Sequence, residues 1–344
     1  MSTLLRQLKL RVPLIVAPMA GGTSTPEFVA ASCEAGALGS MGAAYSTPAQ
    51  MVEFVHQVRA RTARSFAINL FVPTGEVKVT SERLARAEAA TQKHRDEWGL
   101  PRPSLQPPFE EDFDAQFEAM ISLRPDVFSF VFGIPDIHYL REAQRWGITV
   151  IGTATTPEEA ERLTEAGVDA ITLQGIEAGG HRGIFSATEP DAEIPALDLL
   201  CETRSRVKLP LIAAGGLMTA ADVQAALSLG ADAVQMGTLF LATREAGTSA
   251  PHRRALLASG QRRTKTTRAF SGRLARGIEN PFMLEMDAQP DAILPFPAQN
   301  KFTRDLRTAS AKADSADHLS LWCGTGTGAL PTGTVAEVID GLLP

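Results

Sequence analysis

The chain of 344 residues contains only three cysteines, Cys33, Cys201 and Cys323, which lie far apart and form no CxxC pair. Such sparse thiols argue against a disulfide framework and against a structural zinc site, and they favour a reducing compartment. We therefore predict a cytoplasmic protein that holds no metal.

Long apolar runs are also lacking, because no stretch approaches the ~18–20 apolar residues that a membrane-spanning helix needs. The apolar run Val12–Ala20 is short and holds two prolines, so we interpret it as a buried first strand. Lysine and arginine are scattered through a chain of net charge −6, without the basic stripe of a nucleic-acid binder. We expect neither a membrane nor a nucleic acid as a partner.

Short apolar runs instead alternate with amphipathic, alanine-rich segments along most of the chain. Several of these segments open with helix-start signals such as Thr25-Pro26, Thr47-Pro48 and Thr156-Pro157. The predicted strands are Leu14–Ala17, Ala37–Met41, Phe66–Leu70, Val127–Phe132, Thr149–Gly152, Ala170–Leu173, Leu211–Ala214 and Ala233–Met236. Repeated right-handed crossovers close on themselves, so the pattern predicts an α/β fold, a (β/α)8 TIM barrel. A doubly wound open sheet is the alternative, but no GxGxxG follows the first strand.

The strand–helix rhythm breaks twice. Between residues 74 and 124, two polar helical stretches flank the proline-rich Pro101–Pro108, and the tail beyond about Arg262 shows no such rhythm. We predict that residues 1–73 and 125–262 form the barrel. Residues 74–124 and 263–344 would form a mostly helical cap over its mouth and contact the substrate.

A glycine-rich loop follows the sixth predicted strand and carries a single histidine, His181. Gly175, Gly179, Gly180 and Gly183 mark a loop whose backbone approaches a neighbour closely or adopts positive φ. Barrel enzymes keep their chemistry at the carboxyl ends of their strands, which makes His181 a candidate catalytic residue. The alternative is a glycine-rich turn with an incidental histidine.

Two further loops, after the seventh and eighth predicted strands, have the composition of a phosphate site. The first contains Ala214, Gly215 and Gly216, and the second contains Gln235, Met236, Gly237 and Thr238. Glycine allows backbone N–H groups to approach a phosphate, and a threonine adds a hydroxyl donor. Each loop alone is a weak signal, because two glycines also serve simply to turn a strand into its helix.

Polar or polarisable residues mark three more strand ends, at Met19, Asn69 and Gln174. A fixed amide can recognise a flat heterocycle because it offers both a donor and an acceptor. Asn69 and Gln174 also lie in otherwise apolar runs, where burial without a partner is costly. Packing alone is an equal interpretation of Met19.

The motifs that carry a family resemblance are Ala17-Pro18-Met19, Ala67–Phe71, Gly175–Gly183, Ala213–Gly216 and Gln235–Thr238. In this order they resemble the nitronate monooxygenases, formerly called 2-nitropropane dioxygenases, over about Leu14–Phe282. The tail departs from the pattern, because Phe296-Pro297 stands where the family is expected to have Tyr-Pro. That departure concerns substrate contacts from the cap.

The resemblance implies an FMN cofactor with its phosphate on Gly215, Gly216, Gly237 and Thr238. It also implies an isoalloxazine near Met19, Asn69, Gln174 and Gly179, with Ala17 as a further cofactor-binding residue and His181 as the catalytic base. Family members oxidise alkyl nitronates with O2, through a flavin semiquinone and without NAD(P)H, to a carbonyl compound and nitrite. Neutral nitroalkanes are further candidate substrates, and a monomer or a homodimer is expected.

Three other interpretations remain open. Related flavin barrels are NAD(P)H-dependent reductases of quinones or enoyl thioesters. A flavin-free lyase or isomerase of a sugar phosphate is a second alternative, although no lysine lies at a predicted strand end as a Schiff-base candidate. A scaffold protein is the third, and it would need neither the glycine loops nor His181. The remaining histidines (His56, His94, His138, His252 and His318) have no metal-ligand spacing and are expected on the surface.

Overall fold

The computed structural model describes residues 2–258, 263–326 and 328–342, and its main sheet is a barrel of parallel strands. The strand order is β1-β9-β8-β6-β5-β4-β3-β2, and a bridge between Ile15 and Leu38 joins the two outer strands. The strands are β1 (Leu14–Val16), β2 (Gly39–Gly42), β3 (Phe66–Phe71), β4 (Val127–Val131), β5 (Thr149–Ala154), β6 (Ala170–Gln174), β8 (Leu211–Ala214) and β9 (Ala233–Met236). The predicted (β/α)8 barrel is confirmed.

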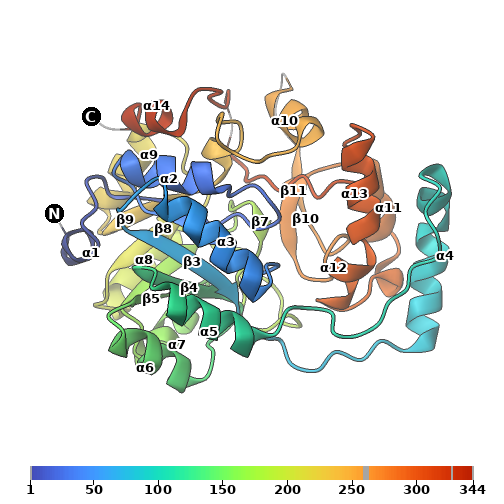
Figure 1. The fold of residues 1–344 in the computed structure, drawn as a ribbon, viewed down its shortest axis with the longest axis horizontal. Helices are drawn as coiled ribbons and strands as arrows, with labels where there is room; N and C mark the ends of the chain where they lie inside the picture. Colours follow the sequence, from blue (N-terminus) through green and yellow to red (C-terminus); the bar gives the residue numbers. More distant parts are fainter. Residues whose placement is uncertain (1, 259–262, 327, 343–344) are drawn as a thin grey trace.

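Helices alternate with these strands and surround the sheet (Figure 1). They are α2 (Pro26–Glu34), α3 (Pro48–Arg59), α5 (Phe113–Leu123), α6 (Ile137–Arg145), α7 (Pro157–Ala166), α8 (Ala196–Arg206) and α9 (Ala220–Ser228). The hydroxyls of Thr25, Thr47 and Thr156 accept hydrogen bonds from backbone N–H groups of the first turns, which is why these helices begin there. Helix α6 is capped in the same way by Asp136, whose side chain accepts from the backbone N–H of His138.

One end of the barrel is closed by the N-terminal segment. Leucines in and after α1 (Thr3–Gln7) pack in one cluster with a small or aliphatic residue from each barrel strand or its start. The cluster contains Leu4, Leu5, Leu8, Leu10, Ile15, Leu38, Ala67, Val127, Ile151, Ala170, Ile212 and Ala233. Because this end is filled, a site has to open at the carboxyl ends of the strands.

The cap lies beside the barrel mouth and is built from two segments distant in sequence (Figure 1). Its elements are α4 (Ser81–Glu97), β10 (Thr264–Thr267), β11 (Ala275–Ile278), α11 (Pro281–Asp287), η2 (Pro290–Ala292), α12 (Ala298–Phe302) and α13 (Arg304–Lys312). The buried Arg95 of α4 donates hydrogen bonds to both carboxylate oxygens of Asp305 on α13, at 2.7 and 3.2 Å. This pair joins the insertion to the tail.

Two helices that the sequence groups with the cap pack on the barrel. Phe117 of α5 lies in the main barrel core with its ring 5.7 Å from that of Phe128 on β4. Val335 and Ile339 of α14 (Val335–Asp340) belong to the same core. The predicted boundary at residue 262 lies outside the described residues. None of the described helices, which include α10 (Ala250–Leu257), is long and apolar enough to span a bilayer.

Candidate active site

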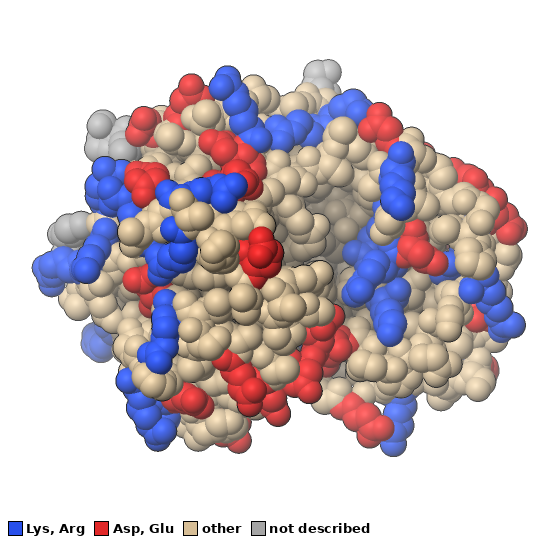
Figure 2. All heavy atoms as spheres, viewed as in Figure 1, with Lys and Arg blue, Asp and Glu red and all other residues tan. Residues whose placement is uncertain are grey.

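A cavity of about 830 Å³ opens at the carboxyl ends of the barrel strands, between their loops and α13. Figure 2 shows the hollow near the centre of the molecule. Every site residue predicted from the sequence lines this cavity: Ala17, Met19, Asn69, Gln174, Gly179, Gly180, His181, Ala214, Gly215, Gly216, Gln235, Met236, Gly237 and Thr238. The structure therefore brings together residues that are up to about two hundred positions apart, and their individual roles stay predictions.

The loops after β8 and β9 have free hydrogen-bond donors. Gly215 and Gly216 adopt φ of +115° and +71°, which a residue with a side chain rarely tolerates. In the described part of the chain, the backbone N–H groups of these glycines and of Gly237 donate to no protein acceptor. Thr238 Oγ1 accepts from the N–H of Gly324 at 2.9 Å, so its own proton is available. These donors suit an anionic phosphate.

Gly179 is required by close packing rather than by its backbone angles. A Cβ at this position would lie 2.5 Å from the backbone nitrogen of Gly324, closer than such atoms approach in proteins. The same Gly324 N–H holds the hydroxyl of Thr238. The glycine–histidine loop, the tail and the loop after β9 thus meet at one point of the cavity wall.

Gln174 and Arg182 hold the glycine–histidine loop in place. Gln174 donates from Nε2 to the carbonyl of His181 at 2.9 Å and accepts at Oε1 from the Gly183 N–H at 2.8 Å. Arg182 is 1% exposed and donates to the Asp191 carboxylate at 2.6 Å. The Gln174 amide therefore uses both its oxygen and its nitrogen in hydrogen bonds to the loop, and Arg182 forms a buried ion pair with Asp191.

His181 is placed by a short strand that the sequence did not predict. Gly180 and His181 form β7 (Gly180–His181), which pairs antiparallel with β11 of the cap. Nε2 of His181 lies 2.8 Å from Ser271 Oγ, and this hydroxyl donates to the Arg273 carbonyl at 3.1 Å. Because the serine has one proton to give, Nε2 of His181 is the donor to it. The neutral ring then has its lone pair on Nδ1.

Aromatic rings surround the imidazole of His181. Their centroids lie 5.6–6.1 Å from the centre of that ring, and they belong to Phe71, Phe132, Phe296 and Trp322. Phe132 adopts a φ of +80°, which is unusual for a bulky residue and is a form of strain concentrated at functional sites. Of these residues, Phe296 and Trp322 come from the tail.

The environment of His181 favours its neutral form. Loss of hydration lowers the pKa of His181 to about 3, and the positive charges of Arg273 and Arg307 act in the same direction. The guanidinium of Arg273 lies 3.8 Å from the centre of the Phe132 ring and is 2% exposed. Sequence reasoning missed both arginines, because nothing in their local pattern marks them as neighbours of a loop about a hundred residues away.

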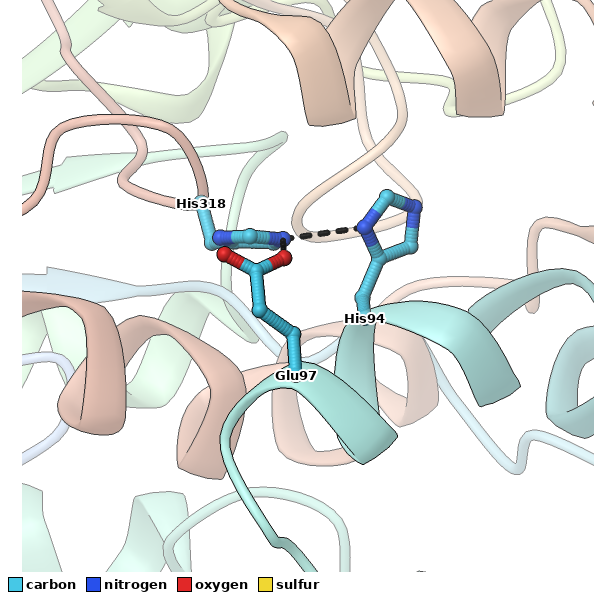
Figure 3. Close-up of side chains that lie close together, drawn as sticks. All are labelled: His94, Glu97 and His318. Carbon is cyan, nitrogen blue, oxygen red and sulfur yellow. Dashed lines mark hydrogen bonds and ion pairs between the residues drawn. The ribbon is translucent and has the colours of Figure 1, made fainter.

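The expectation of surface histidines is wrong for three of the five. His56 and His138 are exposed, whereas His94, His252 and His318 are buried. His252 lines the cavity, and burial lowers its pKa to about 4. His94 and His318 are linked by a hydrogen bond of 2.9 Å, with Glu97 beside them (Figure 3).

Hydrogen bonds determine which ring nitrogen of His318 carries the proton and which nitrogen of His94 accepts it. Trp98 Nε1 donates to His318 Nδ1 at 3.2 Å, so the neutral His318 has its proton on Nε2 and donates it to His94 Nδ1. A metal ligand would need that Nε2 lone pair free. We interpret the cluster as a contact that fixes α4 against the tail.

Comparison with known proteins agrees with this arrangement. The family model described as "Nitronate monooxygenase" matches residues 2–344. A Staphylococcus aureus protein named "Probable nitronate monooxygenase" is 37% identical over 324 residues, 93% of this chain and 90% of its own length. Crystal structures of nitroalkane oxidase from Streptomyces ansochromogenes superpose with a TM-score of 0.93 at 36% identity, covering 99% of this chain and 96% of that one.

FabK from Thermotoga maritima shares the fold, with a TM-score of 0.77 at 24% identity over 99% of this chain and 94% of that one. The full-length family match, the curated relative and the site lead to the same assignment. The chain belongs to the nitronate monooxygenase family of oxidoreductases.

Proposed function

We propose that this protein binds FMN and oxidises alkyl nitronates with O2, releasing a carbonyl compound and nitrite. The observation that carries the proposal is one cavity that joins three features. These are a phosphate-type loop pair, a wall that includes strand-end residues, and a neutral imidazole surrounded by aromatic side chains. At about 830 Å³ the cavity falls within the usual range of ligand pockets, roughly 300–1,000 Å³.

The residues present fit FMN. The unpartnered N–H groups of Gly215, Gly216 and Gly237 and the hydroxyl of Thr238 would hold the phosphate. Met19, which follows β1, and Asn69, which lies on β3, both line the cavity, on strands separated by β2, and would contact the isoalloxazine. The Asn69 side chain is 6% exposed and donates from Nδ2 to Ser129 Oγ at 3.0 Å, which fixes its amide plane. When bound, FMN would accept electrons from the nitronate and pass them to O2.

His181 would act as the base for substrates that still carry an α-proton. Its imidazole is neutral at pH 7, and the Ser271 contact leaves Nδ1 as the atom that takes the proton. A low pKa makes it a weak base, however, and a nitronate needs no proton removed. These properties favour nitronates over neutral nitroalkanes as substrates. Arg182 would not bind the substrate, because its charge is neutralised by Asp191.

The test is cofactor release followed by product analysis. The purified protein should be yellow and should release FMN rather than FAD on heat denaturation. The loaded enzyme should then consume O2 and release nitrite when given an alkyl nitronate. A colourless protein that FMN cannot reconstitute would contradict the cofactor assignment, and a loaded enzyme that releases no nitrite would contradict the reaction.

A further inference from the structure

The cap side of the cavity carries a concentration of positive charge that the overall charge of −6 conceals. Helix α13 contributes Arg304, Arg307 and Lys312 to the cavity wall, and Lys301 of α12 lines the adjoining pockets. In the ranges that the structure describes, none of the four forms an ion pair, while their neighbour Asp305 is engaged by Arg95. Figure 2 shows basic side chains gathered on the cap side of the hollow.

Arg307 is the member of this group that belongs to the main cavity alone. Lys301 lines two adjoining pockets but not the main cavity, whereas Arg304 and Lys312 line the main cavity and at least one of those pockets. Arg307 lines neither of these. Its charge therefore acts mainly on what occupies the main cavity.

The guanidinium of Arg307 is fixed by hydrogen bonds to Asn300 and still has N–H groups that can donate to a ligand. Nη2 donates to the backbone oxygen and to the side-chain oxygen of Asn300, at 2.6 and 2.8 Å. Nη1 donates to no protein group among the described residues, and it is accessible to solvent. A guanidinium already fixed in one orientation loses little entropy on binding a planar anion, and its fork matches two oxygens of that anion.

Tyr45, from the loop after β2, supplies a second donor. Its hydroxyl has no hydrogen-bond partner among the described residues, although the residue lines the cavity. Its ring contacts that of Phe71 at 5.7 Å between centroids, and Phe71 contacts His181 at 5.9 Å. Tyr45, His181 and Arg307 all line this cavity, and the positive charge of Arg307 acts on both of the other two residues.

We propose that Arg307 and Tyr45 form an anion subsite that binds the charged oxygens of an aliphatic nitronate and selects nitronates over neutral nitroalkanes. The identity of the anion rests on the proposed function, whereas the subsite itself does not. A nitronate spreads one negative charge over its two oxygens and can accept from both the guanidinium and the phenol. A neutral nitroalkane offers the same shape without the charge, and it binds a cation less tightly.

The experiment measures binding of nitrate, a planar, redox-inert anion, to the flavin-loaded protein by calorimetry. Hydrogen bonds to charged groups are worth about 1.5–3 kcal/mol, so Arg307→Gln should weaken nitrate binding about 10- to 100-fold. Arg307→Lys should recover part of that loss, and Tyr45→Phe should weaken binding several-fold. The matched control is Arg102→Gln, which removes the same charge from an exposed site on the cap and should leave nitrate affinity unchanged.

A parallel kinetic measurement addresses selectivity. Arg307→Gln should raise KM for a nitronate by a similar factor and change KM for the neutral nitroalkane little. Unchanged nitrate affinity in Arg307→Gln and Tyr45→Phe would overturn the subsite, as would an equal loss in Arg102→Gln. Nitrate binding that depends on Arg307 in a protein inactive toward nitronates would keep the subsite and contradict only the proposed function.

Discussion

Replacing His181 by asparagine separates its two conceivable roles, proton removal and binding. General-base catalysis is worth about 10²- to 10⁴-fold. Because burial and two arginines lower the pKa of His181 to about 3, we expect the lower end of that range. His181→Asn should thus slow turnover of a neutral nitroalkane about 10²-fold. A pre-formed nitronate carries no α-proton, and its oxidation should fall by much less.

The assay compares nitrite release from both substrates on one flavin-loaded preparation, with flavin content measured before and after. This precaution matters because β7 links the loop to the cap, and a disturbed loop that loses flavin would imitate a catalytic defect. Ser271→Ala is the companion variant. It removes the partner that keeps the proton on Nε2 and should slow only the nitroalkane reaction. Equal losses for both substrates would refute the assignment of His181 as a base.

Two further predictions follow from the packing and the buried histidines. Gly179→Ala should lower FMN affinity more than tenfold in a fluorescence titration, because the added Cβ would displace Gly324 and with it the contact to Thr238. The control is Gly341→Ala, whose added Cβ would approach no atom closer than 3.6 Å. Equal FMN affinities for the two variants would contradict the packing argument. Burial lowers the pKa of His94, His252 and His318 in the folded protein, so the unfolded chain takes up protons first as the pH falls. The free energy of unfolding should therefore be at its full value above about pH 6.5 and should decrease below that pH. For His252 the fall from 6.5 to about 4 corresponds to about 3 kcal/mol, and a urea midpoint that does not decrease between pH 7 and pH 4.5 would contradict it.

The barrel and the floor of the site could be predicted from the sequence because their signals are local. A run such as Ala170–Leu173 followed by clustered glycines identifies a strand and its loop, and parallel strands place all such loops at one end. Thr-Pro pairs at Thr25, Thr47 and Thr156 likewise mark helix starts through contacts within one turn.

The cap side could not be predicted in the same way, because its contacts join positions far apart. Ser271 meets His181 only through the pairing of β7 with β11, and Arg307 reaches the cavity only because α13 folds back over the mouth. His94 and His318 are 224 positions apart, so the hydrogen bond that buries both leaves no local pattern. Phe117 of α5 is a similar case, since only tertiary packing assigns it to the barrel.

The central claim is that electrons enter this site from a nitronate, and anaerobic mixing tests it most directly. The flavin-loaded protein is mixed without O2 with an alkyl nitronate in one sample and with NADH or NADPH in another, and flavin absorbance is followed. We predict that the nitronate rapidly reduces the flavin by at least one electron, seen as a change in its absorbance spectrum, while neither nicotinamide reduces it at a comparable rate. Rapid bleaching by NADH or NADPH together with an inert nitronate would contradict the account and indicate a nicotinamide-dependent reductase.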